Sequence, residues 1–255
     1  MNQSDSLRSP GLAYKNLDFL ESDGGRTLRI LSEYLEPYER LRKENIHETV
    51  VFFGSARISS TGPLQSYYDD ARRLASMITT WALGLDGPRR FVICTGGGGG
   101  IMEAANKGAA EAGGVSIGLN IGLPHEQRPN EFVTPELLFE FHYFFMRKLW
   151  FSHLARALVV FPGGFGTLDE LMDTLTLAQT GKLGRKVIII LYGSRYWNEI
   201  INFEALAQHG FIDPEDLNLF TIVDDVDSAF NILQNNLPLS VQEDSPAIAK
   251  SISKS

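Results

Sequence analysis

The 255-residue sequence contains a single cysteine and no surplus of positive charge. Cys94 alone excludes an intramolecular disulfide and a multi-cysteine metal site, and its presence suits a reducing compartment. Its apolar neighbours, Phe91 to Ile93, indicate a small buried side chain rather than a nucleophile. The formal net charge of −8 and the pI near 5.2 argue against a general attraction to nucleic acid or to an anionic membrane.

Other absences narrow the protein class further. No apolar run reaches the roughly 20 residues that span a bilayer. The polar segment Met1 to Pro10 lacks the apolar core of a signal peptide. No histidine–carboxylate spacing is typical of a metal site. The sequence therefore predicts a cytoplasmic protein without a metal and without nucleic-acid or membrane partners.

Two familiar phosphate-binding motifs are also missing. No Gly-Lys-Ser/Thr follows the glycine runs, so there is no Walker loop. Met102 stands where a dinucleotide fingerprint would place its last glycine, and no acidic residue clearly ends the following strand to hold a ribose. A nucleotide site in this chain would therefore suit a mononucleotide.

Apolar runs typical of strands alternate with segments of helical periodicity. An amphipathic helix is predicted over 26–44. Strands are then predicted at 49–53, 90–95, 115–119, 139–143, 157–161, 186–191 and 220–223, and helices at 67–85, 101–112, 144–156, 167–180, 196–208 and 226–234. This alternation predicts an α/β fold, a Rossmann-like doubly wound, mainly parallel sheet with helices on both faces plus the extra N-terminal helix.

The composition of the ends predicts the domain organisation. Residues 1–24 are rich in Ser, Asn, Asp and Gly and predict a loosely ordered lead-in. Residues 25–238 form a single Rossmann-like nucleotide-binding domain in this interpretation, and 239–255 form a polar tail.

Three glycine loops follow three of the predicted strands: Gly54-Ser55, Gly96 to Gly100, and Gly163 to Gly166. The carboxyl ends of parallel strands lie along one edge of a sheet, so we expect these loops to lie together. Glycine lets a backbone approach a ligand closely, and the helix behind the third loop supplies unpaired N–H groups that suit a phosphate. The three loops together predict a nucleotide-sized site.

Glu170 has two interpretations from the residues alone. Thr167 and Glu170 match a capping box, which would contribute about 1 kcal/mol. Alternatively, Glu170 lies beside whatever the glycine loop holds. Arg147 and Lys148, in the helix before the loop's strand, are either solvated or turned to the same edge, where an Arg fork would pair with a carboxylate or phosphate.

The segment Pro162-Gly163-Gly164-Phe165-Gly166-Thr167-Leu168-Asp169-Glu170, preceded by Met146-Arg147-Lys148, resembles the LOG ("Lonely Guy") family. Those proteins are cytokinin-activating phosphoribohydrolases, often mislabelled as lysine decarboxylases. The resemblance covers roughly residues 49–223. The helix at 26–44, the loop at 123–127 and the extended C-terminus resemble the longer bacterial type II branch, in which a proline commonly replaces Gly99. We therefore expect a looser second glycine loop here.

The resemblance implies hydrolysis of the N-glycosidic bond of a purine nucleoside 5′-monophosphate, AMP or a cytokinin riboside 5′-monophosphate, with no cofactor. It makes Glu170 and Arg147 the catalytic pair. The substrate-binding residues that it implies are Gly163, Gly164, Gly166 and Thr167 as the phosphate cradle, Lys148 and Thr176 as further contacts, and Gly54, Ser55, Gly97 and Gly98 along the rest of the site.

The chemistry of that reaction agrees with these residues. A carboxylate at Glu170 would stabilise an oxocarbenium-like ribosyl cation, and Arg147 is expected to orient Glu170 and lower its pKa. The alternative is a non-catalytic carrier of a nucleotide or of molybdenum cofactor, because fold alone does not decide function. The helix at 26–44 and exposed aromatics at Phe144, Phe145, Trp150 and Phe151 predict a homo-oligomer, a dimer or hexamer by family analogy.

Overall fold

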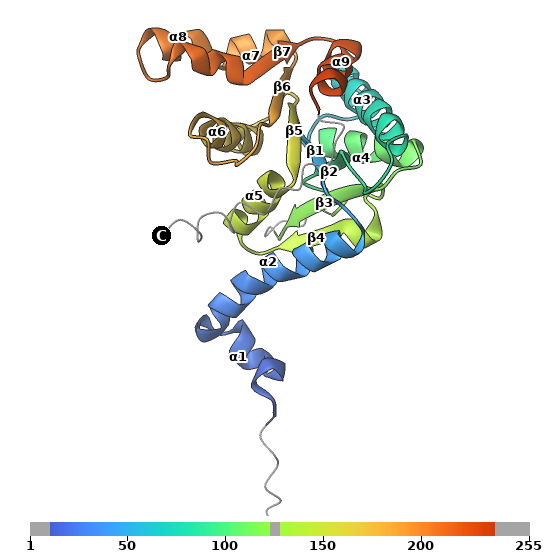
Figure 1. Cartoon of the computed structure of the whole chain (residues 1–255), viewed down its shortest axis with the longest axis vertical. Coiled ribbons are helices and arrows are strands. Elements are labelled where there is room, and N and C mark those ends of the chain that lie inside the picture. Colours follow the sequence, from blue (N-terminus) through green and yellow to red (C-terminus); the bar gives the residue numbers. More distant parts are fainter. Residues whose placement is uncertain (1–10, 123–127, 238–255) are drawn as a thin grey trace, which may run out of the picture.

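The computed structural model describes residues 11–122 and 128–237. In this part of the chain a seven-stranded sheet has the order β4-β3-β2-β1-β5-β6-β7, and every neighbouring pair is parallel (Figure 1). The strands are β1 (Thr49–Phe53), β2 (Val92–Thr95), β3 (Ser116–Ile121), β4 (Leu138–Phe141), β5 (Ala155–Val160), β6 (Ile188–Tyr192) and β7 (Phe220–Val223). The predicted Rossmann-like α/β fold is confirmed.

The sheet is buried on both faces, which explains why its strands are continuous apolar runs. In β1, Val50 and Phe52 belong to one hydrophobic cluster, whereas Val51 and Phe53 belong to the other. Side chains alternate between the faces of a strand, so each cluster fills the space between one face and its helices.

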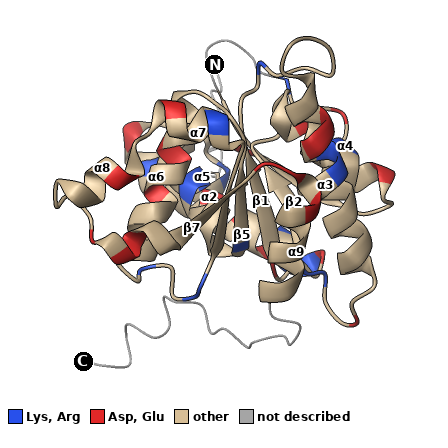
Figure 2. Ribbon diagram, turned by 90° about the horizontal axis from the view of Figure 1, so that it is seen from above, with Lys and Arg blue, Asp and Glu red and all other residues tan. Residues whose placement is uncertain are grey.

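Helices cover both faces (Figure 2). One face is covered by α3 (Gln65–Leu83), α4 (Ile101–Glu111) and α9 (Val226–Asn236), and the other by α2 (Arg26–Lys43), α5 (Phe144–His153), α6 (Phe165–Gln179), α7 (Ser194–Ile200) and α8 (Phe203–Gln208). None of the helices in the described ranges is long and apolar enough to cross a membrane.

The predicted amphipathic helix is α2, and it anchors α5. The Glu33 carboxylate accepts hydrogen bonds from the backbone N–H groups of His142 (2.8 Å) and Tyr143 (3.2 Å), at the start of α5. The Trp150 indole donates to the Glu33 carbonyl at 2.9 Å. Because α5 carries Arg147, α2 fixes the helix on which one candidate site residue lies.

The lead-in is more ordered than predicted. Residues 11–24 include 3₁₀ turns at Ala13–Lys15 and Asp23–Gly25 and the helix α1 (Leu17–Glu21). The Asn16 side chain caps α1 by accepting from Phe19 N–H at 3.2 Å, and the Arg29 guanidinium donates to the Ser22 carbonyl at 2.7 Å. These local hydrogen bonds order the segment although its composition is polar. Residues 1–10, 123–127 and the predicted tail 239–255 lie outside the described residues.

Two predicted helices differ most from those in the structure. The helix predicted at 144–156 ends at His153, and Arg156 lies in β5, where its Nε donates to Glu48 Oε1 at 2.6 Å. Arg90 binds the other oxygen of this buried carboxylate. The helix predicted at 196–208 divides in two, because the Asn202 side chain accepts from Ala205 N–H at 2.9 Å and starts α8.

The prediction of four exposed aromatics is half wrong. Phe144 and Phe145 are exposed, but Trp150 and Phe151 are 3% and 4% exposed. The Trp150 ring packs on α2 and the Phe151 ring packs edge-on against Phe53, with 4.7 Å between ring centroids. These two side chains therefore belong to the core of the subunit.

Candidate active site

The three glycine loops meet at the carboxyl edge of the sheet, as predicted. Ser55 N–H donates to the Pro162 carbonyl at 2.9 Å, and Ile101 N–H donates to the Ser55 carbonyl at 3.2 Å. A Cβ atom at Gly163 would overlap the Thr167 side chain, and one at Gly100 would overlap the backbone of Ser55. The close approach of these loops therefore requires glycine at both positions.

The third loop presents unpaired donors at the start of α6. The helix begins at Phe165 with Gly164 as its N-cap, and no side chain caps it. Among the described residues, no acceptor pairs with the N–H groups of Gly164, Phe165 or Gly166. Adjacent unpaired N–H groups at a helix N-terminus form an anion-binding site. The Gly163 carbonyl, by contrast, accepts from the Tyr196 hydroxyl of α7.

The capping interpretation of Glu170 is wrong. Because α6 begins two residues before Thr167, Thr167 lies inside the first turn rather than at the cap. The Glu170 side chain is 6% exposed and its Oε1 accepts no hydrogen bond within the described ranges. The carboxylate is therefore buried without a role in holding the end of the helix.

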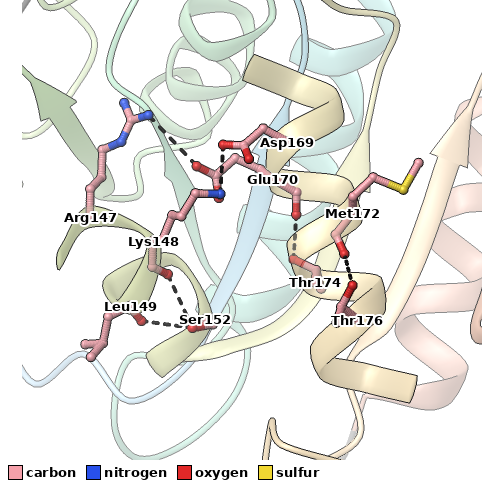
Figure 3. Close-up of polar contacts among 9 residues, drawn as sticks. All are labelled: Arg147, Lys148, Leu149, Ser152, Asp169, Glu170, Met172, Thr174 and Thr176. Atoms are coloured by element: carbon pink, nitrogen blue, oxygen red, sulfur yellow. Dashed lines mark hydrogen bonds and ion pairs between the residues drawn. The ribbon is translucent and has the colours of Figure 1, made fainter. Parts of the chain in front are cut away.

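Two cations of α5 face this carboxylate (Figure 3). Arg147 Nη2 lies 3.9 Å from Glu170 Oε1, and Lys148 Nζ lies 3.6 Å from Glu170 Oε2 and 2.8 Å from Asp169 Oδ2. Both cationic side chains are mostly buried, at 17% and 22% exposure. The interpretation of Arg147 and Lys148 as solvated is therefore wrong, and the predicted pairing of Arg147 with a carboxylate is present.

Burial dominates the electrostatics of this group. It raises the pKa of Glu170 above the usual value, although the charges of Lys148 and Arg147 act in the opposite direction. Burial likewise lowers the pKa of Arg147 against the effect of Glu170. Arg147 acts to lower the pKa of Glu170, as expected, but the net pKa is raised, because desolvation of the carboxylate exceeds the attraction of both cations.

The structure does not bring every predicted site residue together. Thr176 lies further along α6, is exposed, and donates its hydroxyl to the Met172 carbonyl at 2.7 Å, away from the Glu170 carboxylate (Figure 3). Gly97 and Gly98 lie in the second loop, whose carbonyls contact Asn130. Asn130 and Tyr196 were missed from the sequence, because they lie far from any glycine motif in the chain. In the ranges searched, no group of His, Cys, Asp and Glu residues could hold a metal ion.

Fold and site together define a Rossmann-like α/β protein with a glycine-lined site at the carboxyl edge of its sheet. A family model described as "Possible lysine decarboxylase" matches residues 102–233, just over half of the chain. The chain belongs to this family, the LOG family that its motif resembles.

Curated relatives share this family. Two proteins of Arabidopsis thaliana named cytokinin riboside 5′-monophosphate phosphoribohydrolase are similar to the chain. LOG7 is 29% identical over 177 residues, 68% of this chain and 74% of its own length. LOG3 is 29% identical over 181 residues, 69% and 76% of the two chains. These two relatives are therefore named as phosphoribohydrolases, whereas the description of the family model names a decarboxylase.

Two solved structures have the same fold. An X-ray structure of a structural-genomics target has a TM-score of 0.52 at 19% identity, covering 74% of this chain and 99% of its own. The molybdenum cofactor binding protein from the phototrophic bacterium Rippkaea orientalis has a TM-score of 0.51 at 20% identity, covering 76% and 98%. Identities this low support the fold alone.

Proposed function

We propose that the protein hydrolyses the N-glycosidic bond of a purine nucleoside 5′-monophosphate, AMP or a cytokinin riboside 5′-monophosphate, to the free base and ribose 5-phosphate. One observation carries the proposal: the buried Glu170 carboxylate, with no hydrogen bond to Oε1 among the described residues and two cations beside it, adjoins a helix start with unpaired N–H groups. The activity named for the curated relatives supports the same reaction class.

The phosphate would bind at the start of α6. The N–H groups of Gly164, Phe165 and Gly166 are available to its oxygens, and the helix dipole favours its negative charge. Since the phosphate does not react, its binding energy can be used to place the sugar against Glu170.

The chemical step then needs one carboxylate and one water molecule. The bond between C1′ and the base nitrogen breaks, its electron pair leaves with the base, and the ribosyl group passes through an oxocarbenium-like state. Glu170 stabilises that positive charge and accepts a proton from the attacking water, whose oxygen bonds to C1′. The base takes up a proton, so a water molecule is consumed overall. Arg147 orients the carboxylate by its contact with Oε1.

The decarboxylase description of the family does not fit these residues. Lysine decarboxylation on pyridoxal phosphate needs a lysine that forms a Schiff base and is therefore deprotonated to react. Lys148 is the lysine at this site, and although burial disfavours its charge, the ion pair with Asp169 and the charge of Glu170 raise its pKa. An ammonium group held between two carboxylates suits electrostatic stabilisation rather than Schiff-base chemistry.

The second candidate is a non-catalytic carrier of a nucleotide or of molybdenum cofactor, which the fold of one solved structure brings into consideration. A carrier has no need of a desolvated carboxylate beside an arginine, because burying that charge costs free energy. The Glu170–Arg147 pair therefore favours the hydrolase.

A single assay separates the candidates. The protein is incubated with AMP and released adenine is measured by chromatography. We expect turnover by the wild type and a loss of about 10²–10⁴-fold in Glu170→Gln, with AMP binding retained in calorimetry. Glu204→Gln changes an exposed glutamate on α8 and should leave the rate unchanged. Binding of AMP and of a cytokinin riboside 5′-monophosphate by the wild type, without release of either base, would instead identify a carrier.

A further inference from the structure

The second glycine loop is held by a side chain that comes from a distant part of the chain. The Asn130 amide nitrogen, Nδ2, donates to the Gly97 carbonyl at 3.1 Å and to the Gly98 carbonyl at 2.8 Å. The backbone N–H of Asn130 also donates to the Gly97 carbonyl, at 2.8 Å. Asn130 thus binds two successive peptide groups of the loop.

Other buried groups hold Asn130 and the loop in place. Asn106 Oδ1 accepts from Asn130 Nδ2 at 3.0 Å and from the Thr95 hydroxyl at 2.7 Å. The Thr95 hydroxyl oxygen in turn accepts from Gly97 N–H at 2.9 Å. Asn130 Oδ1 accepts from Phe132 N–H at 3.1 Å. These contacts fix the positions of Gly97 and Gly98 within the loop.

The geometry of the peptide bond shows in which direction the N–H groups of this loop point. In a trans peptide the carbonyl of one residue and the N–H of the next point in opposite directions. No cis peptide bond occurs in the described part of the chain. Because the Gly97 and Gly98 carbonyls point to Asn130, the N–H groups of Gly98 and Gly99 point away from it.

Those two N–H groups have no acceptor among the residues that the structure describes. Gly98 is buried, and a buried N–H without an acceptor is unfavourable unless a ligand or water pairs with it. The loop also adjoins the rest of the site, because the Ala56 carbonyl lies 3.7 Å from where a Cβ at Gly99 would stand. The two donors are therefore placed to meet a ligand of the same site.

A carboxylate beside these donors indicates which ligand group fits. Glu103 Oε2 lies 3.9 Å from the Cβ position of Gly99, and Glu103 Oε1 accepts from the Tyr68 hydroxyl at 2.8 Å. A phosphate would be repelled by Glu103. A hydroxyl accepts from an N–H and donates to a carboxylate, so it satisfies both neighbours.

We propose that Asn130 is a positioning residue that presents the Gly98 and Gly99 N–H groups to a sugar hydroxyl of the nucleotide, with Glu103 accepting from that hydroxyl. This inference rests on the proposed function and adds a binding site for a hydroxyl of the sugar, the 2′ or the 3′, to it.

The test uses Asn130→Asp, which has nearly the same shape and keeps the acceptor for Phe132 N–H but removes both Nδ2 hydrogens. The full chain is assayed with AMP, 2′-deoxy-AMP and 3′-deoxy-AMP. We expect KM for AMP to rise about tenfold with kcat within about twofold, since the hydroxyl contact exists before and during the reaction. We further expect the increase to disappear with the deoxynucleotide that lacks the bound hydroxyl. Glu131→Gln, at the exposed neighbouring residue, should behave like the wild type.

A second variant keeps the inference falsifiable should Asn130→Asp fail to fold. Glu103→Ala removes the proposed acceptor of the sugar hydroxyl, which lies 3.9 Å from the Cβ position of Gly99. We expect KM for AMP to rise in this variant and the increase to disappear with the same deoxynucleotide.

The outcomes distinguish the two proposals. An unchanged KM in Asn130→Asp, or an equal penalty on all three nucleotides, overturns the ribose site while AMP hydrolysis by the wild type still supports the proposed function. If the wild type neither binds nor cleaves AMP or a cytokinin riboside 5′-monophosphate, the proposed function is wrong and the ribose site is wrong with it.

Discussion

The Glu170 side chain is subject to two opposing effects, desolvation and the attraction of two cations. Desolvation is the larger, so the carboxyl is protonated more readily than a solvated glutamate. An ionised carboxylate is needed to stabilise the ribosyl cation. We therefore expect kcat/KM for AMP, which reports the ligand-free enzyme, to fall with decreasing pH through a midpoint above 4.5, the ordinary glutamate pKa. A midpoint at or below 4.5 in a pH–rate profile would contradict this assignment.

The same shift has a consequence for stability. A raised pKa means that the ionised form of Glu170 destabilises the fold above that pKa, and that the penalty is relieved as the pH falls through it. Glu170→Gln should therefore melt at a higher temperature than the wild type at pH 8, with the difference shrinking toward pH 4. Thermal melts at both pH values test this, and Glu204→Gln at an exposed position should show no such difference.

At the residue scale, the sequence indicates which side chains form the site, but it does not show how deeply each one is buried. The pairing of Arg147 with a carboxylate was predictable, because Arg147 stands in the helix directly before the strand that carries the glycine loop. The direction of the Glu170 pKa was not, because desolvation depends on how α5 and α6 pack. The exposed position of Thr176 was likewise invisible, since it depends on which face of α6 packs against the sheet.

At the scale of elements, the start of α6 depends on three glycines with different surroundings. A Cβ at Gly163 would overlap the Thr167 side chain and stand 3.0 Å from Ser55 N, whereas at Gly166 nothing lies within 4 Å. We expect Gly163→Ala to destabilise the protein by about 1–3 kcal/mol through overpacking. Gly166→Ala should instead stabilise it by up to about 1 kcal/mol, because alanine favours a helix.

The second variant also tests the phosphate cradle. A methyl group at Gly166 lies at the helix start that the phosphate is proposed to approach, so AMP affinity should fall several-fold even as stability rises. Denaturant unfolding and calorimetric titration with AMP measure the two quantities. If Gly166→Ala binds AMP as tightly as the wild type, the phosphate lies elsewhere.

The helix α7 contributes to the same loop through one hydroxyl. Tyr196 donates to the Gly163 carbonyl, which turns the Gly164 N–H the opposite way, toward the proposed phosphate. Tyr196→Phe keeps the ring and removes this bond. We expect KM for AMP to rise about three- to tenfold with a loss of stability near 1 kcal/mol, measured by steady-state kinetics and urea unfolding. An unchanged KM would show that the loop holds its direction without Tyr196.

Most elements were predictable because apolar runs and glycines mark strand ends clearly, as in β1 and α4. The exceptions have tertiary causes. Arg156 lies in β5 because the buried Glu48 carboxylate pairs with it, a contact between residues 108 positions apart that no local pattern reveals. The lead-in is ordered by hydrogen bonds such as that of Arg29 with Ser22, which composition alone does not show.

At the scale of the whole molecule, the first helices leave apolar side chains uncovered. On α2, Leu28, Leu31 and Leu35 are between 43% and 48% exposed, while Ile30 and Tyr34 on its other face pack against the core. Figure 1 shows α1 and the beginning of α2 extending beyond the sheet and its helices. Exposed apolar stripes of this kind are typical of subunit interfaces, so we propose that this stripe joins copies of the chain.

Leu31→Glu tests that proposal. A charge in the centre of an apolar interface costs several kcal/mol, so we expect the mass in sedimentation equilibrium to fall to that of one chain, 28.3 kDa. Lys43→Glu, at the exposed end of the same helix, should leave the assembly intact. A wild type that already sediments as one chain would contradict the proposal, and an oligomer that persists in Leu31→Glu would place the interface elsewhere.

The order of the strands determines when the protein can become functional as it is synthesised. The central strand β1 ends at Phe53, but β5, its neighbour on one side, begins only at Ala155. Roughly 100 residues must therefore leave the ribosome before that side of β1 is covered, which takes on the order of 5–20 s at ordinary rates of translation. During this interval the nascent chain has an unpaired apolar edge, and neither Arg147 nor Glu170 can yet meet the loop that follows β1.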